Sequence, residues 1–138
     1  VEKKLNFGFA NLVLAVREEF IDIFTTLDLD EVAEEYFKKN KKFIRIGTKY
    51  PSLTKTFLFE RGVTNFSCVR SLGSTELMPT VNSATLISDI VSSGLTMKQN
   101  KLRPLNDGLI LKSQACLMIS KKSTKIQGIK KVINLISK

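Results

Sequence analysis

Histidine and tryptophan are absent from this 138-residue sequence, which contains only two cysteines. Without histidine, a Cys/His zinc site, a Ser-His-Asp triad and a Cys-His pair are all excluded. Cys68 and Cys116 each lie within an apolar segment, so both are expected to be buried strand residues. A disulfide between them is not expected in a reducing compartment.

Long apolar runs are absent too. No segment approaches the roughly 18 consecutive apolar residues that a membrane-spanning helix requires. The start of the chain, VEKKLNFGF, lacks the apolar core of a signal peptide. Hydrophobic residues make up 43% of the chain and charged residues 25%, as in ordinary soluble domains. We therefore expect a compact protein of the cytoplasm that does not enter a membrane.

Negative charge is scarce in the later part of the chain. Residues 1–40 carry five Lys or Arg against nine Asp or Glu, whereas residues 41–138 carry seventeen against four. The resulting field attracts polyanions, which include both phosphorylated substrates and nucleic acids. The basic residues are dispersed and no motif for reading nucleic acid accompanies them. A solvated, lysine-rich surface is the simpler interpretation of the same pattern.

Strand-like segments alternate with helical ones along the chain. Strands are expected over residues 11–16, 43–47, 65–69, 86–90 and 109–119, and helices over residues 28–40, 51–62, 73–76, 95–102 and 123–138. This alternation predicts a layered α/β domain with a mostly parallel sheet. Asp28 and Glu31 have the spacing of a capping box, and Asp107-Gly108 has the composition of a turn. The amphipathic last helix is expected to pack on the sheet, with a membrane surface as the alternative.

The segment Ala84–Met97, ATLISDIVSSGLTM, has the pattern of a phosphate-binding strand, loop and helix. An apolar run reaches Asp89 and is followed by small and hydroxyl-bearing residues, namely Ser92, Ser93, Gly94 and Thr96. Such a turn directs backbone N–H groups and hydroxyls at one point, and a helix near Leu95 adds its positive end. Asp89 is placed to bind sugar hydroxyls or a metal. Because Ser-Ser-Gly turns also close strands that bind nothing, the loop alone leaves both interpretations open.

Three further segments accompany this loop: Arg45–Thr54 (RIGTKYPSLT), Gly73–Pro79 (GSTELMP) and Gly108–Ser120 (GLILKSQACLMIS). In their order and spacing, from about Leu5 to Ser120, the chain resembles the ATP phosphoribosyltransferases. The resemblance implies transfer of the phosphoribosyl group from phosphoribosyl diphosphate to ATP with release of pyrophosphate. This reaction is the first step of histidine biosynthesis.

The same resemblance implies how phosphoribosyl diphosphate is bound. Asp89 takes the ribose hydroxyls, and the 5′-phosphate is held by the loop residues Ser92, Ser93, Gly94 and Thr96. No residue is assigned a catalytic role of its own. Displacement at the anomeric carbon requires alignment of the adenine nitrogen, and Mg²⁺ and basic groups that neutralise the departing pyrophosphate.

Three more residues are candidates for binding ATP or pyrophosphate. Lys49 has the point charge that neutralises a triphosphate or pyrophosphate. Tyr50 either stacks on a base or packs beside Pro51, and Glu76 either binds ribose or caps its own helix. A surface lysine is the alternative for Lys49.

The resemblance implies a fold like the type II periplasmic binding proteins, in which two lobes close over a ligand. Residues 1–108 then form the second lobe, which binds phosphoribosyl diphosphate, together with its entry strand. Residues 109–138 form a strand and amphipathic helix that return to the first lobe. A homodimer and a separate regulatory subunit resembling histidyl-tRNA synthetase are also implied, as in the short form of the family.

Two departures from the family pattern favour alternatives. Ala84-Thr85 stands where the family usually has Ala-Asp, so one carboxylate is missing. Family members also normally carry most of a first domain before the point that matches Val1. A non-catalytic remnant or fragment of the enzyme is therefore one alternative, and a basic nucleic-acid-binding module is the other.

Overall fold

The structure, a computed structural model, describes residues 3–136 and divides into two compact units. The larger unit spans residues 11–112, and the smaller one combines residues 1–10 with residues 113–138. The boundary expected after residue 108 falls inside strand β6 (Leu102–Ser113), which belongs almost wholly to the larger unit.

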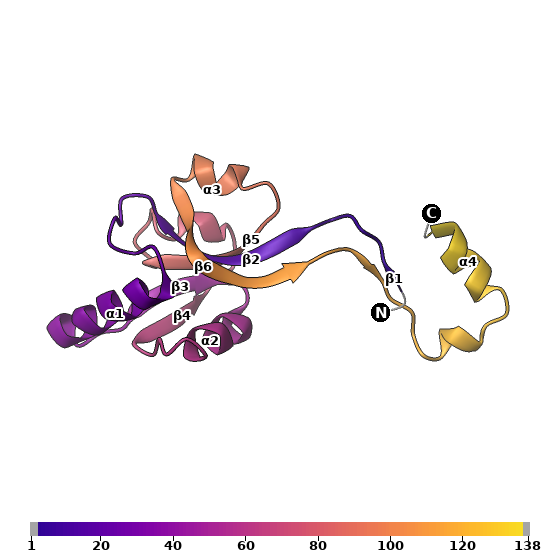
Figure 1. The fold of residues 1–138 in the computed structure, drawn as a ribbon, viewed down its shortest axis with the longest axis horizontal. Coiled ribbons are helices and arrows are strands. Elements are labelled where there is room, and N and C mark those ends of the chain that lie inside the picture. Colours follow the sequence, from indigo (N-terminus) through magenta and orange to yellow (C-terminus); the bar gives the residue numbers. More distant parts are fainter. Residues whose placement is uncertain (1–2, 137–138) are drawn as a thin grey trace. The chain divides into compact units, whose positions relative to one another are not determined.

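Five strands form the sheet of the larger unit, in the order β4-β3-β5-β2-β6 (Figure 1). Besides β6 they are β2 (Ala10–Arg17), β3 (Ile44–Thr48), β4 (Phe66–Arg70) and β5 (Leu86–Val91). The first four strands predicted from the sequence are therefore confirmed, with bounds that shift by at most one residue.

The strands of this sheet mostly point the same way. β3 is parallel to β4 and to β5, whereas β2 is antiparallel to β5. The Glu18 N–H donates to the carbonyl of Lys101 near one end of the β2–β6 pair. At the other end the Ser113 hydroxyl donates to the carbonyl of Ala10, so β6 is antiparallel to β2. Only β2 opposes the other four strands, which confirms the expected α/β class with a mostly parallel sheet.

Helices cover both faces of this sheet. α1 (Thr26–Asn40) and α2 (Pro51–Phe59) lie on one face, and α3 (Leu95–Gln99) lies on the other (Figure 1). Alternate residues of β2 enter the two cores, Leu14 packing with the first pair of helices and Ala15 with α3. Because the middle of the sheet is covered on both faces, β2 is a continuous apolar run rather than an alternating one.

The start of α1 differs from the expected capping box. Thr25 is the N-cap, its hydroxyl accepts from the Asp28 N–H at 3.2 Å, and the Asp28 carboxylate accepts from the Thr25 N–H at 2.8 Å. Asp28 is thus the N3 partner of the box, not the cap that pairing with Glu31 predicts. That prediction is wrong because the helix begins two residues earlier, at Thr26.

Asp107-Gly108 is not a turn, which corrects a second expectation. Both residues lie inside β6, and the Asp107 carboxylate accepts from the backbone N–H of Thr26 at 2.8 Å and from its hydroxyl. A Cβ on Gly108 would lie 2.9 Å from the carbonyl oxygen of Leu14. The acid anchors the first turn of α1, and the glycine allows close approach to β2.

Further element bounds also differ from the sequence prediction, and α2 ends at Phe59 instead of residue 62. α3 ends at Gln99, because β6 begins at Leu102. The strand expected over residues 109–119 is divided: β6 ends at Ser113, and Cys116–Leu117 form a separate strand, β7.

Cys68 and Cys116 are free thiols, as expected, but their side chains are only half-buried.

The smaller unit contains a short antiparallel pair and two helical segments. β1 (Lys3–Lys4) pairs with β7, and they are followed by the 3-10 turn η2 (Ser123–Lys125) and by α4 (Ile129–Ile136). The single helix expected over residues 123–138 is interrupted at Gly128, whose φ of +86° is a left-handed conformation. Residues 137–138 lie outside the described part. No helix in residues 3–136 is long and apolar enough to cross a membrane.

Candidate functional site

The predicted site residues converge at one edge of the sheet. β3, β4 and β5 are parallel and end at Thr48, Arg70 and Val91. The segments that follow these ends contain every predicted site residue except Asp89, which lies in the last half of β5. Ligands in open α/β sheets bind at this carboxyl edge.

The loop after β5 forms a small hollow. Its volume is about 60 Å³, and it is lined by Ile90, Val91, Ser92, Ser93, Gly94, Thr96 and Met97. Gly94 has a φ of +75°, which favours glycine there. Within the described residues, the backbone N–H groups of Ser93 and Gly94 have no hydrogen-bond partner. Since pockets for whole drug-sized ligands start at about 300 Å³, this hollow suits a single phosphate group.

Asp89 lies close to two of the other predicted residues. Its half-buried carboxylate accepts from the Ile90 N–H at 2.9 Å. Burial raises the pKa of the Asp89 carboxyl above its usual value, and the negative charge of Glu76 raises it further. The Ile90 N–H and the Lys49 ammonium act in the opposite direction. The structure thus brings Asp89, Lys49 and Glu76 together, although Asp89 does not line the phosphate-sized hollow.

Tyr50 is the N-cap of α2, with Pro51 at the first helical position as expected. Its N–H donates to the Thr48 hydroxyl at 2.9 Å, and its carbonyl accepts from the Thr54 hydroxyl at 2.9 Å. Neighbouring Lys49 is exposed, and the Tyr50 side chain is half-buried. The backbone of this turn is therefore held firmly, while stacking of Tyr50 on a base stays a prediction.

A buried cluster of hydroxyls joins the two loops, and the sequence interpretation missed it. The side chains of Thr48, Thr54 and Ser88 are completely buried. The Thr54 hydroxyl lies 2.9 Å from the Ser88 hydroxyl and 3.4 Å from that of Thr48. The sequence does contain a signal for this cluster, namely hydroxyl-bearing residues at core-facing positions of otherwise apolar segments. The neighbouring Leu53 is exposed, because Thr54 occupies the inward position.

A second set of hydrogen bonds fixes the position of the segment that contains Glu76. The Ser71 N–H donates to the carbonyl of Thr48 at 3.0 Å, which ties the end of β4 to β3. The buried Thr75 hydroxyl donates to the Ser71 hydroxyl at 3.0 Å. Thr75 opens the 3-10 turn η1 (Thr75–Leu77), so these bonds fix the place of Glu76.

Metal ligands are few at this edge. Within the described residues, no three His, Cys, Asp or Glu side chains lie together. Asp89 lies at this edge, and the negative charge of Glu76 acts on the Asp89 carboxyl. Mg²⁺ is commonly bound by one or two carboxylates together with substrate phosphates, and this donor set fits that mode of binding.

Relatives of this sequence share one name. The family described as HisG, ATP phosphoribosyltransferase, matches residues 1–138. The ATP phosphoribosyltransferase of Chelativorans sp. is 44% identical over 123 residues, which cover 88% of this chain and 54% of that protein. The enzyme of Brucella suis is 43% identical over 124 residues, covering 89% and 54%. The chain thus spans about half the length of the curated relatives it matches.

Solved structures support the fold. The ATP phosphoribosyl transferase (HisG:HisZ) complex from Thermotoga maritima matches with a TM-score of 0.68 and 22% identity, covering 99% of this chain and 58% of that one. Holo ArgBP from T. maritima matches with a TM-score of 0.57 and 14% identity, covering 99% and 56%. The expected likeness to type II periplasmic binding proteins is confirmed. The match of the family model along residues 1–138 shows that the chain belongs to the ATP phosphoribosyltransferase family.

Proposed function

We propose that this chain supplies the phosphoribosyl diphosphate-binding lobe of an ATP phosphoribosyltransferase. The enzyme transfers the phosphoribosyl group to ATP and releases pyrophosphate, in the first step of histidine biosynthesis. The observation that carries the proposal is the convergence of the Ser92–Thr96 loop, Asp89 and Lys49 at one sheet edge. Family membership supports the same activity.

The loop and Asp89 bind different groups of phosphoribosyl diphosphate. The 5′-phosphate lies in the small hollow, where it accepts from the free N–H groups of Ser93 and Gly94 and from the neighbouring hydroxyls. Asp89, earlier on the same strand, accepts hydrogen bonds from the ribose hydroxyls. A carboxylate beside the phosphate would repel it, so the separation of Asp89 from the hollow suits this division.

The transfer itself requires positioning more than covalent chemistry. The bond from the anomeric carbon to the pyrophosphate oxygen breaks, and pyrophosphate keeps the electron pair. A bond from the adenine nitrogen to the same carbon forms. Lys49 is exposed beside Asp89 and neutralises phosphate charge that develops on the leaving group. Glu76 and Tyr50 are the proposed contacts to ATP, through its ribose and base.

Mg²⁺ supplies further neutralisation of the diphosphate. Asp89 and Glu76 are the carboxylates of this chain that would hold it, with the remaining ligands coming from substrate oxygens and water.

Assembly is the remaining part of the proposal. We expect a homodimer that works with a regulatory subunit resembling histidyl-tRNA synthetase. The support is the name of the Thermotoga maritima neighbour, which is a two-component HisG:HisZ complex. A non-catalytic remnant or fragment of the enzyme is the alternative, and Thr85 in place of the family's usual acid agrees with it.

Calorimetric titration with phosphoribosyl diphosphate and Mg²⁺ tests the proposal. We expect saturable binding that depends on Mg²⁺ and is lost in Asp89→Asn. Glu60→Gln, on the exposed end of α2, is the matched control that removes one carboxylate away from the site. Unchanged binding in Asp89→Asn would remove Asp89 from the site. Absence of binding in a folded sample would favour the remnant, and salt-sensitive binding of random duplex instead would favour the nucleic-acid alternative.

A further inference from the structure

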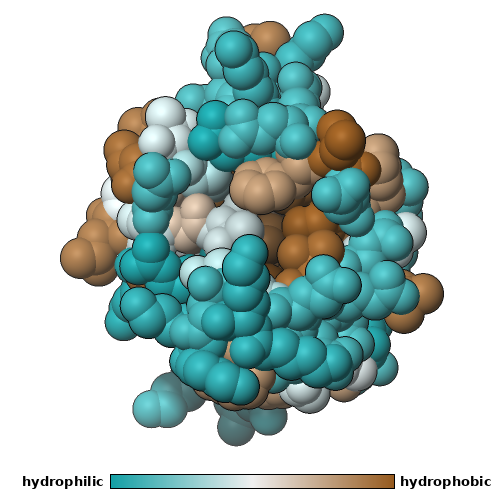
Figure 2. Space-filling model, turned by 90° about the vertical axis from the view of Figure 1, so that its left-hand side faces the viewer, coloured by the Kyte–Doolittle hydropathy of each residue, from teal (hydrophilic) through white to brown (hydrophobic). Residues whose placement is uncertain are grey.

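A second and larger hollow lies at the opposite edge of the sheet in the larger unit. Its volume is about 260 Å³, and it is formed where β3 and β5 begin and β2 ends. β5 separates it from the phosphate loop by six strand residues, or roughly 20 Å. On the face where α1 projects, apolar side chains are recessed among hydrophilic ones (Figure 2).

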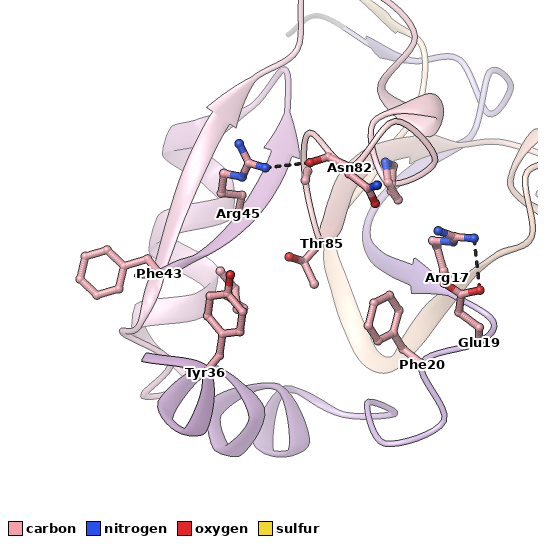
Figure 3. A pocket seen from close by; sticks show the side chains of 11 residues that line it. Arg17, Glu19, Phe20, Tyr36, Phe43, Arg45, Asn82 and Thr85 are labelled. Atoms are coloured by element: carbon pink, nitrogen blue, oxygen red, sulfur yellow. Dashed lines mark hydrogen bonds and ion pairs between the residues drawn. The ribbon is translucent and has the colours of Figure 1, made fainter. Parts of the chain in front are cut away.

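Two guanidinium groups belong to this second hollow. Arg45 projects from the start of β3, and its Nη2 donates to the carbonyl of Asn82 at 2.7 Å (Figure 3). An arginine has five N–H donors in a rigid fork, so this bond orients the group and leaves further donors available. Arg17 is paired with Glu19 at 3.1 Å. With two guanidiniums and one carboxylate, the lining has one unmatched positive charge.

Aromatic rings form another part of the lining, and they come from Phe20, Tyr36 and Phe43. Tyr36 comes from α1 and Phe20 from the segment after β2, and Figure 3 shows Thr85 between them. The backbone of Phe20 is anchored, because the Arg103 guanidinium donates to the Phe20 carbonyl at 2.6 Å. Aromatic side chains have only two rotatable bonds, so they can stack on a planar ligand at a low cost in entropy.

We propose that this second hollow binds a small carboxylate that carries a single aromatic ring. The carboxylate accepts two hydrogen bonds from Arg45, whose planar fork matches it. The ring stacks between Tyr36 and Phe20, and Thr85 offers a hydroxyl to a second polar group. A monoanion matches the one unmatched positive charge, and the volume is below the range of about 300–1,000 Å³ that holds larger ligands.

This site is independent of the proposed transferase activity, and its test needs no assay of that activity. Benzoate is titrated into the chain while backbone amide shifts are followed by NMR. We expect saturable shifts at Phe20, Arg45 and Thr85. Cyclohexanecarboxylate lacks the aromatic face and benzamide lacks the charge. The affinity of each should be lower than that of benzoate by about tenfold or more, and tenfold corresponds to about 1.4 kcal/mol.

Variants test the same site. Arg45→Gln and Tyr36→Leu should each weaken benzoate binding about tenfold, whereas Lys55→Gln, a surface change on α2, should not. Arg45→Lys keeps the charge and loses the fork, so it should also bind weakly. If Arg45→Gln does not fold, the comparison of the three ligands on the parent chain decides. Equal binding of benzoate and cyclohexanecarboxylate, or shifts confined to the Ser92–Thr96 loop, would overturn the proposal.

Discussion

The hydroxyl of Thr54 lies 2.9 Å from the hydroxyl of Ser88, and both side chains are completely buried. Thr54 belongs to α2 and also donates to the carbonyl of Tyr50, at the start of that helix. Ser88 directly precedes Asp89 in β5. One buried hydroxyl therefore connects the Lys49-Tyr50 turn to the strand that leads into the Ser92–Thr96 loop.

Replacement of Thr54 by valine should lower the free energy of unfolding by about 1–3 kcal/mol, because the Tyr50 carbonyl and the Ser88 hydroxyl lose their buried partner. Thr54→Ser keeps the hydroxyl and should be less destabilised than Thr54→Val. Urea unfolding of the two variants measures the difference. Equal stability of the two variants would show that the hydroxyl bonds contribute little.

Asp89→Asn should stabilise the free protein slightly at neutral pH while abolishing phosphoribosyl diphosphate binding. Burial raises the pKa of Asp89 in the folded state, so its ionised form lowers stability. The loss of stability begins as the pH rises past the pKa that Asp89 has in the unfolded chain. It is complete above the higher pKa that Asp89 has in the folded protein. The advantage of the variant should therefore disappear at low pH. Thermal unfolding between acidic and neutral pH measures it, and a constant difference would contradict the assignment.

The pKa of Asp89 should respond oppositely to its two charged neighbours. Lys49→Gln removes a favourable charge and should raise this pKa further, whereas Glu76→Gln removes an unfavourable one and should lower it. A carboxyl-carbon NMR titration reads both shifts directly. Lys98→Gln, in α3, serves as a control for the loss of one lysine. If neither neighbour moves the pKa, the three residues do not form one electrostatic site.

Gly108→Ala should lower the free energy of unfolding by about 1–3 kcal/mol. The added Cβ would lie 2.9 Å from the carbonyl oxygen of Leu14, and this backbone atom cannot move without disturbing β2. Gly73→Ala is the matched control, since its Cβ would meet no atom within 4 Å. Denaturant unfolding separates the two, and a neutral Gly108→Ala would show that β6 can shift away from β2.

Asp107→Ala should weaken the start of α1. The carboxylate accepts from the N–H and hydroxyl of Thr26, so its removal should lower the free energy of unfolding by about 1–2 kcal/mol. Glu31→Ala, an exposed change on the same helix, should have a much smaller effect. Faster hydrogen exchange of the first-turn amides in Asp107→Ala would locate the loss. Unchanged exchange would contradict the anchoring role.

Local patterns predicted much of the fold. Apolar runs predict strands β2 to β5. The local backbone preferences of proline and glycine predict the start of α2 and the turn before α3. Asp107 was misread for the same reason: beside glycine it has turn chemistry, whereas its partner Thr26 is 81 residues away in the sequence.

The α/β class, the pattern of the Ser92–Thr96 loop and the family resemblance can be predicted from the sequence, because each depends on short segments and their order. Which residues contact one another follows only from the three-dimensional packing. Parallel strands bring Lys49, Glu76 and Asp89 to one edge, and buried hydroxyls from β3, α2 and β5 hold that edge together. The hollow beside Arg45 is likewise assembled from separate segments. Such contacts depend on the register and packing of segments far apart in the chain, which no local pattern specifies.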